Sequence, residues 1–89
     1  LHLAAAQVKR DGRVIPLLGK ERALLAYLLT HRGEVVGRDE LLDRVWGYAA
    51  DVSSRTVDVH IAALRKKIER QPHRPRILQT VHGEGYRVV

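Results

Sequence analysis

Four apolar residues in the C-terminal half of the chain recur at the spacing of one helix face. Val57, Ile61, Leu64 and Ile68 lie at positions i, i+4, i+7 and i+11. At about 100° per residue they fall within one narrow stripe, which predicts an amphipathic helix over residues 55–70. Pro72 and Pro75 follow the stripe, and proline disfavours helix in the residue before it, so we expect the helix to end there.

The opposite side of this helix has cations near its ends and small or apolar residues in its middle. These outward residues are Arg55, Val59, Ala62, Ala63, Lys66 and Arg70. A face that is only solvated usually carries more charge at its centre. Because small side chains let a helix backbone come close to a partner, the composition favours a helix that contacts another macromolecule.

Two shorter helices are expected before it. Leu24, Leu25, Leu28 and Leu29 form an apolar stripe that predicts a helix over Lys20–Arg32. Leu41, Leu42 and Val45 predict a second helix over Arg38–Trp46, which Gly47 ends. A loop then leads to Ser54, the expected N-cap of the long helix.

Both ends of the chain have strand patterns. Residues 1–17 read as short strands, with Asp11-Gly12 as a two-residue hairpin turn between Gln7–Arg10 and Arg13–Pro16. Residues 77–81 and 86–89 alternate like strands around the turn Gly83-Glu84-Gly85. The chain is therefore expected to be an α+β domain with an N-terminal antiparallel sheet, three helices and a C-terminal β-hairpin.

The charge of the chain is uneven. Residues 1–54 hold eight Lys/Arg and seven Asp/Glu, whereas residues 55–89 hold eight and three, so nearly all of the net charge of +6 lies in the last third. A basic segment of this kind suits a polyanion, most often nucleic acid. It predicts about five or six phosphate contacts and a steep salt dependence of binding.

Composition also limits the classes of protein. The 89 residues form one domain, and the absence of cysteine excludes disulfides and thiolate metal sites. No apolar run approaches the ~20 residues of a membrane span and no signal peptide opens the chain, so we expect a cytoplasmic protein that has no membrane partner. The chain lacks an initial methionine, and we expect it to be part of a longer protein with a domain before residue 1.

Two consecutive helices followed by a basic hairpin suggest a helix-turn-helix unit with a wing. The major groove of DNA admits one α-helix, and alanine and valine can contact thymine methyl groups there. Cations at Arg55, Arg65, Lys66 and Lys67 would meet phosphates or guanine edges. The expected function is therefore sequence-specific binding of double-stranded DNA, with residues 55–68 in the major groove and the wing, 80–87, at the minor groove.

Several long motifs also resemble one known family. The segments are 40–47 (ELLDRVWG), 54–61 (SRTVDVHI), 64–68 (LRKKI) and 80–87 (TVHGEGYR). They resemble the OmpR/PhoB-type effector domain of bacterial two-component response regulators, a winged helix-turn-helix, and the resemblance covers nearly the whole chain. It implies a four-stranded N-terminal sheet, a preceding phosphoacceptor receiver domain, transcriptional control downstream of a phosphorelay, and two copies bound head-to-tail on direct-repeat half-sites.

The resemblance also assigns site residues. Those implied to face the groove are Arg55, Val59, Ala62, Ala63 and Arg65, with Lys66 beside them. Those implied to touch the DNA backbone are Arg38, Trp46, Thr56 and His60, and Thr80 and His82 would belong to the wing. The loop implied to contact RNA polymerase is Gly47, Tyr48, Ala49, Ala50, Asp51, Val52 and Ser53.

The sequence departs from this family at several positions. Leu18 replaces a frequent threonine cap, and Arg22 replaces a frequent aromatic residue. Ala62 and Ala63 stand where polar residues are frequent, which favours A·T-rich half-sites read by methyl contacts and shape over guanine readout. His82 stands where arginine is common, which makes the wing cation dependent on pH.

Other readings of the same residues are weaker. The five histidines lack metal-ligand spacing, so we expect no metal or other cofactor. Ser53, Ser54, Asp58 and His60 are catalytic residue types, but Asp58 and His60 face different ways on a helix, so we expect no enzyme. Trp46 is either a core residue or a phosphate donor through its indole N–H.

Three alternative functions stay open from the residues. The long helix could bind an acidic protein partner, as a protein-interaction winged helix. A small RNA-binding domain is a second alternative, although Tyr27, Trp46, Tyr48 and Tyr86 do not cluster for base stacking. Within the DNA reading, the domain could instead serve a regulator outside any phosphorelay.

Overall fold

The computed structural model describes residues 2–4, 7–17, 19–48 and 51–89. Leu18, Ala49 and Ala50, which the sequence singled out, lie outside the described residues. The described elements run in the order β1 (His2–Ala4), β2 (Gln7–Arg10), β3 (Arg13–Ile15), α1 (Gly19–Thr30), α2 (Arg38–Trp46), α3 (Ser54–Ile68), β4 (Leu78–Val81) and β5 (Gly85–Val88). The α+β winged-helix class expected from the sequence is confirmed.

The N-terminal strands form an antiparallel sheet in the order β1-β2-β3. Asp11 and Gly12 have φ of 51° and 76°, the left-handed values that a two-residue hairpin turn needs, so the predicted turn is confirmed. The described residues contain three strands of this sheet rather than the four implied by the resemblance.

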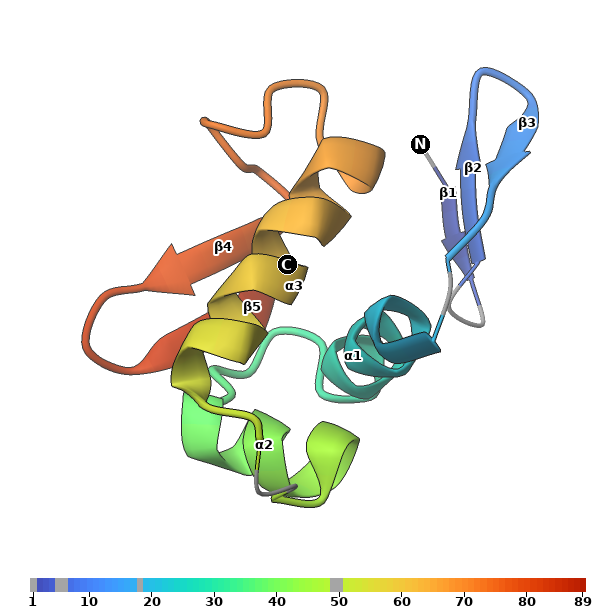
Figure 1. The fold of residues 1–89 in the computed structure, drawn as a ribbon. Helices are drawn as coiled ribbons and strands as arrows, with labels where there is room; N and C mark the ends of the chain where they lie inside the picture. The colour runs from blue at the N-terminus through green and yellow to red at the C-terminus, as the bar shows by residue number, and fades with distance from the viewer. Residues whose placement is uncertain (1, 5–6, 18, 49–50) are drawn as a thin grey trace.

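The helices pack around one core, with α3 across the middle of the molecule (Figure 1). The wing β4–β5 lies on one side of α3, and the N-terminal sheet lies on the other (Figure 1). Leu24, Leu25 and Leu28 from α1 meet the α3 stripe in this core. The buried hydrophobic side chains are Val8, Leu17, Leu24, Leu25, Leu28, Val36, Leu41, Leu42, Val45, Val57, Ile61, Leu64, Ile68, Leu78, Tyr86 and Val88.

The segment after α1 joins the wing. The Val36 N–H donates to the Tyr86 carbonyl at 2.8 Å, and the Tyr86 N–H donates to the Val36 carbonyl at 2.9 Å. This close pairing explains Gly85, where φ is 147° and a Cβ would lie 2.1 Å from the Val36 carbonyl oxygen. The wing is thereby attached to the helical core on one edge, because β5 pairs with both β4 and Val36.

The long helix differs from its prediction at both ends. Its N-cap is Ser53, one residue before the expected Ser54, and the Ser53 N–H donates to Thr56 Oγ1 at 3.3 Å. It ends at Ile68 rather than Arg70, because Glu69 leaves the helix with ψ of 142°. The carboxylate of Glu69, which is 3% exposed, accepts N–H bonds from Arg76, Ile77 and Leu78 at 2.9, 2.9 and 2.8 Å. The helix therefore stops where this residue satisfies the backbone leading into β4.

The other boundaries follow the sequence closely. Helix α2 has the predicted limits, and α1 spans Gly19–Thr30 rather than Lys20–Arg32. In the wing, Gly85 belongs to β5 rather than to the turn. Among the described residues, no helix is long and apolar enough to cross a membrane.

Candidate nucleic-acid interface

The outward side of α3 has the character expected from its sequence. Arg55, Val59, Ala62 and Lys66 are exposed, and Ala63 beside them is half-buried. Val59 is 59% exposed at the centre of this face. We call these five residues the recognition surface. It presents an apolar, low-relief centre between two cations, a shape that fits the floor of a groove.

The flank of α3 that faces the wing carries Asp58 and Arg65. The sequence places Arg65 among the residues that would face a groove, and in the structure its guanidinium is hydrogen-bonded to the wing. Its guanidinium Nε donates to the Leu78 carbonyl at 3.0 Å, its terminal nitrogen donates to Thr80 Oγ1 at 2.8 Å, and its charge lies 5.6 Å from the centre of the Tyr86 ring. Arg65 therefore holds β4 against α3, and burial lowers its pKa from the ordinary value.

Tyr86 and Asp58 form a second contact between the wing and α3. The Tyr86 hydroxyl donates to the Asp58 carboxylate at 2.5 Å, and Arg38 Nε forms an ion pair with the same oxygen at 3.1 Å. Burial first, and then the hydrogen bond to Asp58, raises the pKa of Tyr86 above that of a free tyrosine. The hydroxyl therefore stays protonated, and it stays a donor, at neutral pH.

The opposite flank of α3 faces the other two helices. His60 Nδ1 lies 2.8 Å from the Thr56 carbonyl, and its ring meets Trp46 edge-on at 5.1 Å between centroids. Trp46 packs against the core at the end of α2. Lys67 was grouped with cations that would meet DNA, but its Nζ is paired with Glu21 at 2.6 Å and donates to the Pro16 carbonyl. Lys67 therefore joins α3 to α1.

The wing and the starts of two helices enclose a hollow of about 430 Å³. Arg38 lines it from the first turn of α2, Ser54 from the first turn of α3, and Thr80 and His82 from the wing. The structure thus brings together Arg38, Thr80 and His82, which the sequence assigned separately. It does not bring Trp46 and His60 to this hollow, because they lie on the other flank of α3.

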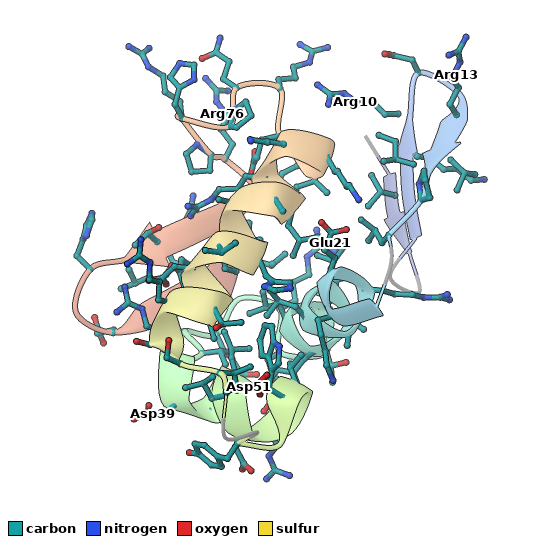
Figure 2. The ribbon with its side chains drawn as sticks, in the orientation of Figure 1. Arg10, Arg13, Glu21, Asp39, Asp51 and Arg76 are labelled. Carbon is teal, nitrogen blue, oxygen red and sulfur yellow. The ribbon has the colours of Figure 1, made fainter. Side chains whose placement is uncertain are left out.

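The cations of the last third do not share one face. Arg55 and Lys66 lie on the recognition surface, whereas Arg65, Lys67 and Arg87 are hydrogen-bonded within the fold. Arg70, Arg74 and Arg76 lie in the loop 69–77, and with Arg10 they line a separate hollow of about 520 Å³. Figure 2 shows Arg10 and Arg76 at the end of the molecule opposite Asp39 and Asp51.

The loop between α2 and α3 is divided between surface and core. Tyr48 is 59% exposed and Asp51 is exposed, whereas Val52 packs against the core and Ser53 caps α3. Gly47 ends α2 and donates its N–H to the Asp43 carbonyl at 3.0 Å. In the described part of this loop, Tyr48, Asp51 and Ser53 have exposed side chains, and of these Ser53 is already used to cap α3.

The sequence analysis did not identify three residues that position the elements around the recognition surface. Asp58 and Tyr86 join the wing to α3, and Glu69 fixes the start of β4. One signal was available, namely an acidic residue at 58 on the flank of a strongly basic helix. No group of three His, Cys, Asp or Glu in the described ranges is placed to hold a metal ion.

Comparisons with known proteins agree with this geometry. A family model described as "Transcriptional regulatory protein, C terminal" matches residues 12–88. A probable transcriptional regulator, ycf27 of Cyanophora paradoxa, is 42% identical over 82 residues, covering 90% of this chain and 34% of that protein. The chain spans about a third of the length of the curated relatives it matches.

Solved structures show the same fold. The response regulator DrrB of Thermotoga maritima, described as an OmpR/PhoB homologue, has a TM-score of 0.79 and 41% identity over 88% of this chain and 35% of that one. The DNA-binding domain of Klebsiella pneumoniae RstA, solved in complex with the RstA box, has a TM-score of 0.80 and 35% identity over 92% and 81%. The chain therefore belongs to the family of C-terminal domains of transcriptional regulatory proteins, of the OmpR/PhoB type.

Proposed function

We propose that this domain binds double-stranded DNA sequence-specifically, with α3 in the major groove and the wing at the minor groove, as part of a transcriptional regulator. The observation that carries the proposal is the recognition surface, where an exposed valine and two alanines lie between Arg55 and Lys66 on a rigid helix. A relative with the same fold has been solved with its DNA box, which supports the same use of this surface.

Two exposed valines allow a matched test. Val59 is 59% exposed on the recognition surface, and Val14 is 53% exposed on β3. Val59→Asp places a carboxylate in the groove, where it is repelled by phosphates and by base acceptors, so we expect binding to fall at least about tenfold. Val14→Asp adds the same charge elsewhere and is expected to change binding less than about twofold.

The measurement is fluorescence anisotropy with a labelled duplex that the unaltered domain has selected from a random pool. Single-stranded DNA, RNA duplex and a polyglutamate peptide serve as competitors. Binding of RNA in preference to duplex DNA would support the RNA-binding alternative instead of this proposal. Binding of the acidic peptide in preference to duplex DNA would support the protein-interaction alternative. Equal losses in the two valine variants would show that α3 is not the surface used.

We infer that A·T-rich half-sites are preferred. Ala62 and Ala63 offer methyl groups and no hydrogen-bond donors at the helix centre, and methyl contacts select thymine. Two copies arranged head-to-tail would give half-sites about one helical turn apart, near 10–10.5 base pairs. The duplexes recovered in the selection test both features, since a G-rich core or inverted half-sites would contradict them.

The regulatory setting is a further proposal. The names of two relatives, which are response regulators, support a place in a response regulator. We infer that a phosphoacceptor receiver domain precedes this one, and binding to chromosomal DNA would place the protein in the cytoplasm. The exposed Tyr48 and Asp51 are proposed as the contact with RNA polymerase. Tyr48→Ala is then expected to reduce transcription in a purified system while DNA affinity stays unchanged.

A further inference from the structure

An acidic residue occupies the side of α3 that faces the wing. Asp58 is one turn from Arg55 and Ala62 along the helix, and its side chain is 36% exposed. A carboxylate at this place repels a polyanion, so its charge alone works against the proposed DNA binding. Its contacts within the fold show a different use.

Asp58 joins three elements. From its place on α3, its carboxylate forms an ion pair with Arg38 Nε of α2 at 3.1 Å and accepts a hydrogen bond from the Tyr86 hydroxyl of β5 at 2.5 Å. Arg38 and Tyr86 both line the hollow between the helix starts and the wing. One carboxylate of α3 thereby contacts both a cation of α2 and a strand of the wing.

Arg65 completes the connection two turns further along the same flank. It holds the Leu78 carbonyl and the Thr80 hydroxyl, and it lies against the ring of the same Tyr86. The wing is therefore fixed to α3 at two points, Asp58 through Tyr86 and Arg65 through β4. Together with the backbone pairing of Val36 and Tyr86, these two points set the distance and the tilt of the wing relative to α3.

The ion pair of Arg38 and Asp58 is poorly suited to contribute much to the stability of the fold. Arg38 and Asp58 have side chains that are 50% and 36% exposed, and exposed ion pairs typically contribute little to folding. Their effect on DNA binding is larger than their effect on stability. Base and phosphate contacts of a winged helix form together only if the recognition helix, the wing and α2 match the spacing of the grooves.

We propose that Asp58 is a positioning residue for DNA recognition, which sets Arg38 and the wing at the separations from α3 that sequence-specific binding requires. The proposal rests on the proposed function. It predicts that Asp58 lowers the affinity for any DNA through its charge and raises the affinity for the correct DNA through its geometry. The two effects have opposite signs, so they can be separated.

The test uses Asp58→Asn and Tyr86→Phe with two duplexes of equal length, the selected site and a scrambled version. For Asp58→Asn we expect the affinity for the selected site to fall about tenfold, the effect of losing a charge-assisted hydrogen bond, while affinity for the scrambled duplex is unchanged or slightly higher. Tyr86→Phe keeps every charge and removes one hydroxyl, and it should lower the affinity for the selected site alone.

Asp43→Asn is the matched control for charge. Asp43 is an exposed carboxylate on α2 that pairs with Arg44 at 3.8 Å, and it is not among the residues that line the hollow beside the wing. Its loss should change the affinity for both duplexes by the same small factor. Thermal unfolding of each variant shows whether the fold is kept, and Tyr86→Phe remains informative if Asp58→Asn does not fold.

The outcomes separate this proposal from the proposed function. If the unaltered domain does not prefer the selected duplex, the function fails and the positioning role fails with it. If that preference is present but Asp58→Asn and Tyr86→Phe leave the ratio of the two affinities unchanged, the positioning role alone is refuted. A rise in both affinities, as for Asp43→Asn, would show that Asp58 acts only through its charge.

Discussion

Replacing the two cations of the recognition surface should change how DNA binding depends on salt. Each phosphate neutralised by a cation contributes a slope of about −0.9 to log K against log salt. Three cations are placed to meet phosphates near α3, namely Arg55, Lys66 and the half-exposed Arg38. We therefore expect a slope of about −3, and not the value near −5 that the charge of the last third suggests.

The double variant Arg55→Gln/Lys66→Gln removes two of these contacts. Its slope should fall in magnitude by about 2, to near −1, so that its affinity changes about fourfold between roughly 50 and 200 mM salt instead of about sixtyfold. Anisotropy of a labelled duplex, measured between roughly 50 and 200 mM salt, gives the slopes directly. Thermal unfolding should hardly change, because both side chains are exposed.

The matched control is Arg74→Gln/Arg76→Gln. It removes the same charge from exposed positions of the loop 69–77, away from the recognition surface. We expect its slope to stay near −3. A slope near −5 for the unaltered domain that falls by about 2 in this control would show that the loop arginines contact phosphates, and that the surface assigned to DNA is incomplete.

Three further variants test individual contacts. Leu64→Ala truncates a fully buried side chain and should lower the free energy of unfolding by about 2–5 kcal/mol in chemical denaturation. Glu69→Ala leaves three backbone N–H groups without their acceptor, so a loss of about 1–3 kcal/mol is expected, and an unchanged unfolding curve would contradict that role. His82→Arg tests the wing: DNA favours the protonated histidine, so this part of the affinity is present at low pH and is lost as pH rises. The unaltered domain should bind more tightly near pH 6 than near pH 8, and the arginine variant should lose most of that difference. If the arginine variant keeps the difference, the pH dependence comes from His60 and not from the wing.

The faces of the helices could be read from the sequence because they depend on local periodicity. Val57, Ile61 and Leu64 are buried, and Val59 is exposed, as the 3.6-residue repeat requires. The turn at Asp11-Gly12 and the limits of α2 also follow from neighbouring residues. The fold class and the position of the recognition surface on α3 were therefore fixed at the level of the sequence.

The partners of the polar side chains were decided by the tertiary structure. Asp58 and Tyr86 are 28 residues apart in the chain, and Lys67 and Glu21 are 46 apart, so no local pattern pairs them. The sequence counts Arg65 and Lys67 as charges available to DNA, but packing turns both toward acceptors inside the fold. Counting residues gives the total charge of a chain, whereas the directions of its side chains depend on which elements meet, and that is settled only when the core closes.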